Sequence, residues 1–427
     1  MPSVSVKLYS VFFKLILRHK LQSLLHQAQA QALAAADETT QFGITCRPDE
    51  STAPANPTFG PDGVATKDIH VDPLSSLSLR LFLPDTSLAR RSNGHAPDGT
   101  PTTGTPTTGT PTAGGTYGGY LPSPSTRRRS AGSRKLPVIL QFHGGAFVAG
   151  SNTSAANDFF CRRISKLLDV IVVAVGYRLA PESRYPAAFD DGVKVLNWLG
   201  KQANLAECSK SLGSTKGSGS GDVMRSQIVD ALGASAVEPW LAAHADPSRC
   251  VLLGVSCGAN IADFVARKAV EAGKLIEPVK VVAQVLMYPF FAGTVPTHSE
   301  LKLANSYIYD KSLCILAWKL FLPEENFTLD HPAANPLAPN RGPPLRYMPP
   351  TLTVAAEHDW MKDRAIAYSE ELRKVNVDAP VLEYKDAVHE FATLDMLLRT
   401  PQAQACVDDI AIWVKKYISI RGHEFSY

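Results

Sequence analysis

Short apolar segments recur along the chain after residue 135 and alternate with longer segments of mixed polarity. Each short segment is rich in β-branched residues, which is typical of strands buried on both faces of a parallel sheet. The segments between them are long enough for helices, so the pattern predicts an α/β fold with helices on both faces of a mainly parallel sheet. The predicted strands are 138–142, 171–175, 250–255, 281–287, 352–356 and 381–384.

A different pattern precedes these segments. Leu77, Leu79 and Leu81 alternate with polar residues, as expected for a strand with one buried face. Residues 68–72 are predicted to form its partner strand, across a turn at 73–76. We expect this hairpin to add antiparallel strands to one edge of the sheet.

Two stretches interrupt the alternation with small and polar residues. Residues 86–134 consist largely of Gly, Pro, Ser, Thr and Arg, and residues 209–222 are rich in Gly and Ser. Neither stretch has the apolar content to form a core, so we expect flexible surface insertions. The sequence therefore predicts one domain, residues 46–427, that carries both insertions and follows a helical segment in residues 1–45.

The N-terminal segment predicts an amphipathic helix rather than a membrane anchor. Residues 8–17 are apolar, but Lys14 interrupts them and they fall short of the roughly 20 residues that a transmembrane helix needs. We expect the helix to pack on its own domain; the alternative is reversible contact with a membrane surface. The apolar side of this helix comprises Leu8, Phe12, Leu15 and Ile16.

Composition and charge narrow the choice of partner and compartment. The 427 residues are 45% hydrophobic, and 43 Lys and Arg against 40 Asp and Glu give a net charge of +3. This balance does not favour nucleic acid as a partner. The seven cysteines show neither Cys-x-x-Cys nor Cys/His spacing, so we expect no disulfide framework, no metal site and a reducing, cytoplasmic compartment.

One motif indicates a nucleophilic serine. Gly254-Val255-Ser256-Cys257-Gly258 directly follows an apolar run and forms a G-x-S-x-G pattern between a predicted strand and helix. Its glycines allow the sharp bend that exposes a serine Oγ at the carboxyl end of the sheet. A nucleophilic serine also needs a histidine to accept its proton, a carboxylate to orient that histidine, and donors for the oxyanion.

Asp359 and His389 follow the serine in the required order. Asp359 comes just after one predicted strand and His389 just after the next, so both lie at the carboxyl ends of parallel strands. Glu357 and Asp363 compete for the role of the acid, and Asp359 taken alone equally fits a helix N-cap. We predict Ser256, Asp359 and His389 as nucleophile, acid and base because they occur in order at three strand ends.

The oxyanion donors are predicted in a separate turn. His143-Gly144-Gly145-Ala146 follows the first strand of the parallel region, and paired glycines let backbone N–H groups approach a substrate oxygen. We predict the N–H groups of Gly145, Ala146 and Cys257 as donors, with Gly144 as a further candidate. His143 is interpreted as a residue that braces the turn rather than as a second base.

Five motifs occur in order along the chain: HGGAF at 143–147, GYRLAPE at 176–182, YPAAFDDG at 185–192, GVSCGAN at 254–260 and HEF at 389–391. Together they resemble the plant carboxylesterases of the hormone-sensitive-lipase-like branch of the α/β-hydrolases. The resemblance covers about residues 1–85 and 136–420. It implies a carboxylic-ester hydrolase for small to medium hydrophobic esters, without a metal or organic cofactor, and a lid formed partly by the N-terminal helices.

The chain departs from the family pattern without losing a catalytic group. Ala146 replaces the third glycine of His-Gly-Gly-Gly but keeps its N–H. Val255, Cys257 and Ala259 replace Asp, Ala and Gly in the usual Gly-Asp-Ser-Ala-Gly-Gly-Asn. Cys257 is interpreted as a small buried residue, and the alternative is that it makes the enzyme sensitive to thiol modification.

Two other functions stay open. The gibberellin receptor resembles this family but lacks the triad histidine, so His389 favours catalysis over a non-catalytic hormone receptor. A scaffold or lipid-surface protein that works through its N-terminal helix is a third interpretation. The apolar residues Phe290, Phe291, 301–309 and Trp360 fit either an acyl pocket or ordinary core packing, so the sequence does not define the acyl or alcohol group.

Overall fold

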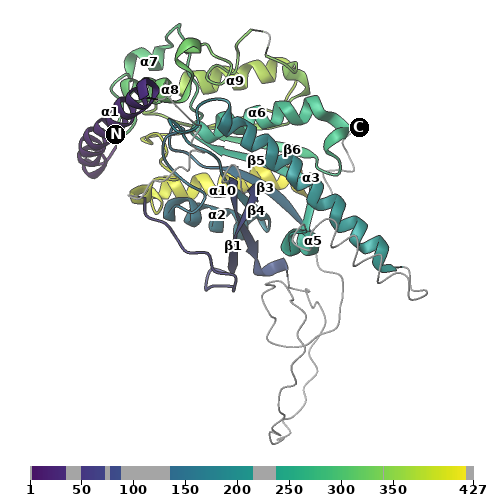
Figure 1. Ribbon diagram of the computed structural model, residues 1–427. Helices are drawn as coiled ribbons and strands as arrows, with labels where there is room; N and C mark the ends of the chain where they lie inside the picture. The colour runs from purple at the N-terminus through teal and green to yellow at the C-terminus, as the bar shows by residue number, and fades with distance from the viewer. Residues whose placement is uncertain are drawn as a thin grey trace, which may run out of the picture.

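The computed structural model describes residues 2–34, 50–72, 77–87, 135–214, 237–339 and 341–419. Strands in this part of the chain form one sheet in the order β1-β2-β4-β3-β5-β6-β7-β8 (Figure 1). β2 pairs antiparallel with β1 and β4, and all other neighbours run parallel. The predicted fold class, a mainly parallel sheet with antiparallel leading strands, is therefore confirmed. The strands are β1 (Val64–Asp72), β2 (Leu77–Pro84), β3 (Leu136–Phe142), β4 (Ile171–Gly176), β5 (Ala245–Val255), β6 (Val281–Met287), β7 (Thr351–Ala356) and β8 (Val381–Tyr384).

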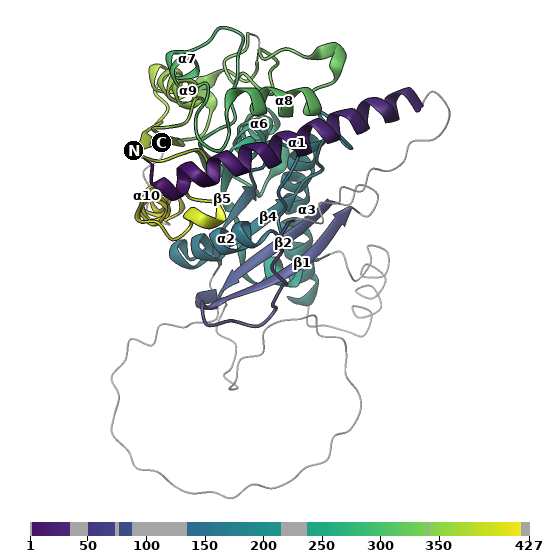
Figure 2. The same cartoon turned by 90° about the vertical axis from the view of Figure 1, so that its left-hand side faces the viewer.

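Helices cover both faces of this sheet (Figures 1 and 2). α2 and α10 pack on one face, and α3, α6 and α9 pack on the other. Alternate residues of β3 show why both faces are apolar, since Val138 and Leu140 belong to the core on one face and Ile139 to the core on the other. The helices are α1 (Val4–Ala34), α2 (Ala155–Leu168), α3 (Ala187–Ser214), α5 (Pro239–His244), α6 (Cys257–Ala272), α7 (His298–Lys302), α8 (Lys311–Phe321), α9 (Lys362–Lys374) and α10 (Pro401–Ile418).

The predicted insertions fall largely outside the described residues. This holds for 88–134, for 215–222 and for the hairpin turn at 73–76. Positions 209–214 continue α3, which ends at Ser214.

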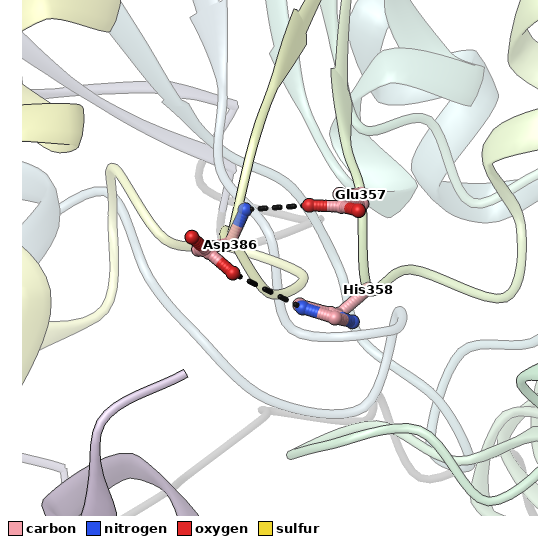
Figure 3. Close-up of side chains that lie close together, drawn as sticks. All are labelled: Glu357, His358 and Asp386. Carbon is pink, nitrogen blue, oxygen red and sulfur yellow. Dashed lines mark hydrogen bonds and ion pairs between the residues drawn. The ribbon is translucent and has the colours of Figure 1, made fainter. Parts of the chain in front are cut away.

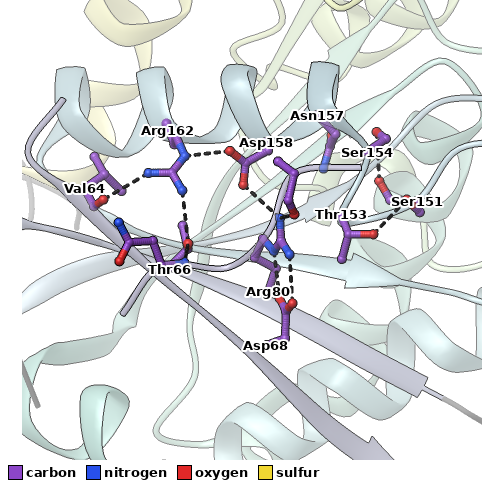
Figure 4. Close-up of polar contacts among 12 residues, drawn as sticks. Val64, Thr66, Asp68, Arg80, Ser151, Thr153, Ser154, Asn157, Asp158 and Arg162 are labelled. Carbon is purple, nitrogen blue, oxygen red and sulfur yellow. Dashed lines mark hydrogen bonds and ion pairs between the residues drawn. The ribbon is translucent and has the colours of Figure 1, made fainter. Parts of the chain in front are cut away.

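A buried arginine fastens the leading hairpin to the helix layer (Figure 4). Arg80 on β2 is 1% exposed and forms ion pairs with Asp68 of β1 at 2.7 Å and with Asp158 of α2 at 3.0 Å. Arg162 then pairs with the same Asp158 at 2.6 Å and donates to the Val64 carbonyl oxygen at 3.0 Å. A buried guanidinium is tolerated here because carboxylates on two elements neutralise it.

The N-terminal helix packs on its own domain, as expected, but through other residues than predicted. α1 crosses one end of the sheet beside α8 (Figure 2). Its inward side chains include Val6, Ser10 and Leu21, which are 7%, 3% and 2% exposed. The four predicted contact residues face outward instead. Leu8, Phe12, Leu15 and Ile16 are 59%, 65%, 64% and 68% exposed.

Ion pairs and a second apolar side explain which face of α1 turns inward. Lys14 and Arg18 lie 3.5 and 3.7 Å from the Asp310 carboxylate at the start of α8. The Ser10 hydroxyl accepts the Ile308 N–H at 2.8 Å. The helix is therefore apolar on two sides, and polar contacts select one of them. None of the described helices combines the length and apolar character needed to cross a bilayer.

Candidate active site

Ser256 lies in a strained turn between β5 and α6. Its φ of 51° and ψ of −119° belong to a region that residues with a side chain rarely adopt. A Cβ on Gly258 would lie 2.2 Å from the Phe142 carbonyl oxygen, and one on Gly254 would lie 2.3 Å from the Gly258 oxygen. Both glycines of the G-x-S-x-G pattern are thus required by close backbone approach.

Three predicted side chains meet at the carboxyl ends of three strands. The Ser256 Oγ lies 2.7 Å from His389 Nε2, and His389 Nδ1 lies 2.6 Å from Asp359 Oδ2. All three residues are at most 2% exposed. Since β5, β7 and β8 are parallel, the turns that follow them place these side chains at one edge of the sheet.

Asp359 is the carboxylate that contacts His389. Its second oxygen, Oδ1, accepts the Met361 N–H at 2.9 Å, so both carboxylate oxygens are used. The competing carboxylates of Glu357 and Asp363 accept backbone N–H groups of other segments, at 2.8 and 2.7 Å. The choice among the three acids therefore follows from their hydrogen bonds.

The surroundings of His389 favour its protonated form. Burial is the largest single influence and lowers the pKa of the imidazole, but the charge and hydrogen bond of Asp359 together with the charge of Glu390 outweigh it. The net pKa of His389 lies above its ordinary value of 6.5. The rings of Tyr288 and Tyr309 contact the imidazole edge-on, with centroids 5.3 and 5.2 Å away.

The turn predicted to supply oxyanion donors has an unusual backbone. Gly145, Ala146 and Phe147 have φ values of 111°, 54° and 64°. A Cβ on Gly145 would lie 2.1 Å from the Ala149 carbonyl oxygen, so only glycine fits there. Positive φ values are unusual at Ala146 and Phe147, which carry a Cβ, and such strained backbone is often found at functional sites.

His143 braces this turn from within the core. Its ring stacks on Tyr177 with centroids 4.2 Å apart, and its Nδ1 lies 2.7 Å from the Gly144 carbonyl oxygen. The Tyr177 hydroxyl donates to the His143 carbonyl oxygen at 2.8 Å. Burial lowers the pKa of His143 to about 4, so the ring is neutral at physiological pH. These contacts fit the predicted bracing role.

Cys257 connects the serine turn to the oxyanion turn. Its Sγ accepts the Phe147 N–H at 3.2 Å and lies 3.4 Å from the Tyr177 hydroxyl. The residue is fully buried, and burial raises the pKa of the thiol to about 12. The sequence predicts a small buried residue here, and its hydrogen bonds add a second bracing contact. Sensitivity to thiol reagents stays a hypothesis, which full burial disfavours.

A small cavity of about 20 Å³ lies beside the oxyanion turn. Gly145 and Ala146 line one side, Leu17 and Leu21 of α1 cover another, and Tyr309 lies at its edge. A volume of this size holds about one water molecule. A larger cavity of about 340 Å³ lies at the amino end of β5, at the opposite end of that strand from Ser256.

The apolar residues considered for an acyl pocket divide into two groups. Phe290, Phe291 and Trp360 are at most 2% exposed and belong to the main core, where Phe290 stacks on Trp318 with centroids 5.1 Å apart. Tyr309, in contrast, lines the cavity beside the oxyanion turn. Core packing therefore accounts for the first group, and Tyr309 is the residue next to the site.

A second polar cluster lies beside the acid (Figure 3). Glu357, His358 and Asp386 place possible metal-ligand atoms within 4.8 Å of one another, the one such group found in the described residues. The Asp386 N–H donates to the Glu357 carboxylate at 2.8 Å, and the His358 N–H donates to the Ala387 carbonyl oxygen at 2.9 Å. These bonds tie the loop that carries Asp359 to the loop that carries His389, so we interpret the cluster as a brace.

Sequence reasoning missed Glu390, which appears above only as part of the HEF motif. Glu390 is 7% exposed, and its carboxylate lies beside the Tyr309 hydroxyl and against the turn at Gly144 and Gly145. Burial raises the pKa of Glu390, and His389 counteracts this in part. The signal available in the sequence was a charged residue directly after the predicted base, within an otherwise apolar run.

Known proteins match the chain along its whole length. The profile of the alpha/beta hydrolase fold family matches residues 139–393. Probable carboxylesterase 16 from Arabidopsis thaliana is 66% identical over 458 residues, which cover 100% of both chains. A gibberellin receptor from Arabidopsis thaliana is 31% identical over 341 residues, covering 79% of this chain and 75% of the receptor.

A solved structure agrees with the fold. The hyperthermophilic esterase from the archaeon Pyrobaculum calidifontis superposes with a TM-score of 0.56 at 19% identity, covering 98% of this chain and 100% of the esterase. At this identity the similarity concerns the fold alone. The family match and the full-length relative together show that this chain belongs to the alpha/beta hydrolase family and, within it, to the group that contains the plant probable carboxylesterases.

Proposed function

We propose that this protein hydrolyses carboxylic esters through an acyl-enzyme formed on Ser256. Two linked hydrogen bonds carry the proposal. Ser256 Oγ lies 2.7 Å from His389 Nε2, and His389 Nδ1 lies 2.6 Å from Asp359 Oδ2. A serine nucleophile, a base and an orienting carboxylate are the groups that acyl transfer requires. The similarity to a probable carboxylesterase supports an ester as the substrate.

In the first step His389 Nε2 accepts the proton as Ser256 Oγ attacks the ester carbonyl. Asp359 holds Nδ1–H, which leaves Nε2 free to accept that proton, and stabilises the imidazolium that forms. The raised pKa of His389 is the equilibrium counterpart of this stabilisation. His389 then protonates the leaving alcohol, and in the second half of the reaction it activates the water that hydrolyses the acyl-enzyme.

The N–H groups of Gly145, Ala146 and Cys257 receive the oxyanion in this mechanism, with Gly144 as a further candidate. The strained backbone at Gly145 and Ala146 supports this role, because strain of this kind is often found at functional sites. His143 stays neutral beneath the turn and takes no part in proton transfer.

We further propose that α1 acts as a lid. The three reacting residues are at most 2% exposed, and Leu17 and Leu21 of α1 cover the cavity beside them. In this proposal an ester reaches Ser256 when α1 moves away from the cavity. The cavity lining is mostly apolar, which favours small to medium hydrophobic esters over charged ones.

Ester hydrolysis by the Ser256→Ala variant tests the proposal. We expect turnover to fall on the order of 10³-fold or more, as in other enzymes that lose a triad member. Nitrophenyl esters from acetyl to decanoyl would also define the acyl preference. Ser248→Ala is the matched control, because Ser248 is exposed and lies near the opposite end of β5. Wild-type turnover by Ser256→Ala would contradict the proposal.

A non-catalytic receptor is the second candidate, favoured by the 31% identity to a gibberellin receptor. Saturable binding of a small molecule without hydrolysis of any ester in the panel would favour that role. The hydrogen bond between Ser256 and His389 supports catalysis instead.

A further inference from the structure

Glu390 occupies a position that the proposed reaction needs for its substrate. Its carboxylate lies beside the N–H of Gly145, one of the donors assigned to the oxyanion. The contact is close, since a Cβ on Gly144 would lie 2.2 Å from Glu390 Oε1. A carboxylate oxygen carries the same charge and accepts the same hydrogen bonds as the oxyanion of a tetrahedral intermediate.

Two unfavourable features coincide at this residue. Glu390 is 7% exposed, although buried carboxylates are costly unless a charge or hydrogen bonds compensate them. Its φ of 60° lies in the left-handed region, where glycine or asparagine is expected. The carboxylate nevertheless lies inside the site, beside Tyr309 and against the turn at Gly144 and Gly145. Strained and buried polar residues that persist at an active site point to a role in its function.

We propose that Glu390 occupies the oxyanion hole of the substrate-free enzyme as an internal ligand, and that an ester must displace it before Ser256 can attack. This inference rests on the proposed esterase function. Displacement is required because two negative charges cannot share the Gly145 N–H in a buried site. Glu390 thereby lowers the apparent affinity for esters and disfavours acyl groups that do not reach its position.

The lid and the internal ligand are connected through one short segment. The Tyr309 hydroxyl lies beside the Glu390 carboxylate, and the Phe13 ring of α1 contacts the Tyr309 ring with centroids 5.3 Å apart. The next residue, Asp310, pairs with Lys14 of α1 at 3.5 Å. Movement of α1 therefore disturbs the partner that holds Glu390 over the oxyanion turn.

Steady-state kinetics and phosphonate labelling of Glu390→Gly and Glu390→Gln test this proposal. Glycine adopts the φ of 60° without strain and removes the carboxylate. We expect Glu390→Gly to lower KM for short nitrophenyl esters at least threefold with kcat maintained, and to speed fluorophosphonate labelling of Ser256 by a similar factor. Glutamine keeps an acceptor for the Gly145 N–H but loses the charge, so Glu390→Gln should fall between glycine and wild type.

The same measurements separate this proposal from a purely structural role. If Glu390 only braced the turn, both folded variants would lose kcat and thermal stability with no gain in KM or labelling rate, and this result would overturn the inference. Because Glu390→Gln nearly preserves size, it provides the test even if Glu390→Gly does not fold. Failure of the wild-type protein to hydrolyse esters or to label at Ser256 would instead refute the proposed function.

Discussion

The reacting end of the sheet and the helix that covers it are built in different ways. Ser256, His389 and Asp359 are almost fully buried, and hydrogen bonds of 2.7 and 2.6 Å link them. α1 instead exposes a continuous apolar stripe, and half-buried side chains, ion pairs and only a few fully buried side chains hold it to the domain. The stripe consists of Val4, Leu8, Val11, Phe12, Leu15 and Ile16, which are 57–72% exposed.

This difference fits the separate tasks proposed for the two regions. In the proposed mechanism the strand ends fix the reacting groups, because a displacement of about 1 Å in a reacting group lowers the rate steeply. A covering helix with few buried contacts opens at a lower free-energy cost than the sheet does, which suits control of access. Substitutions at the strand ends should therefore change rates, whereas substitutions in α1 should change stability and opening.

The largest expected effect comes from Asp359→Asn. An amide leaves His389 without its orienting carboxylate, and we expect kcat to fall on the order of 10³ to 10⁴-fold, as in comparable triads. Asp363→Asn is the matched control, since that carboxylate accepts the Ser299 N–H and does not contact His389. Equal losses in the two variants would contradict the assignment of the acid.

The pH dependence of the same variant sharpens the assignment. Burial lowers and Asp359 raises the pKa of His389, with a net increase above 6.5. Protonated His389 cannot accept the serine proton, so wild-type kcat/KM should decline with decreasing pH through a midpoint above 6.5. Without the charge of Asp359 burial dominates, and the midpoint of Asp359→Asn should move to lower pH. A shift to higher pH would be inconsistent with this electrostatic account.

An intermediate effect is expected for Leu21→Ala in α1. Leu21 is 2% exposed and covers the cavity beside the oxyanion turn. Removing its buried methyl groups should cost about 2 kcal/mol or more. Leu21 is one of only a few fully buried side chains of α1. We therefore expect the loss of stability to appear as faster amide hydrogen exchange in α1. Unchanged exchange there would mean that the inner face of α1 does not hold the lid.

The smallest effect is expected for Leu8→Ala on the same helix. Leu8 is 59% exposed, so the same chemical change removes little buried surface. The free energy of unfolding, and the free energy of opening that amide exchange reports for α1, should each change by less than about 0.5 kcal/mol. A loss of stability as large as that expected for Leu21→Ala would show that another surface covers the outer apolar stripe of α1 in solution.

The sheet was predictable because its signal is local. Buried parallel strands need runs of apolar, β-branched residues, and each predicted run lies within an observed strand. β5 begins at Ala245, ahead of the predicted position 250, because its first residues are polar and lack that pattern. The order of Ser256, Asp359 and His389 was readable for a related reason, since each residue follows a strand directly.

Contacts between distant segments were not predictable. α1 is apolar on two sides, and only its ion pairs with Asp310 show which side turns inward. The contact between Cys257 and the oxyanion turn joins residues that are 110 positions apart. Glu390 was missed because its role depends on where the turn at Gly145 lies in space. The meeting of the three triad side chains supports their assigned roles, which stay predictions until activity is measured.

Mass spectrometry of the intact protein after treatment with a fluorophosphonate tests the central claim most directly. The account predicts one phosphonyl adduct, located on the peptide that contains Ser256, and its loss in both Ser256→Ala and His389→Ala. An unlabelled wild-type protein, or an adduct on another residue that persists in Ser256→Ala, would contradict the assignment of Ser256 as the acylated nucleophile.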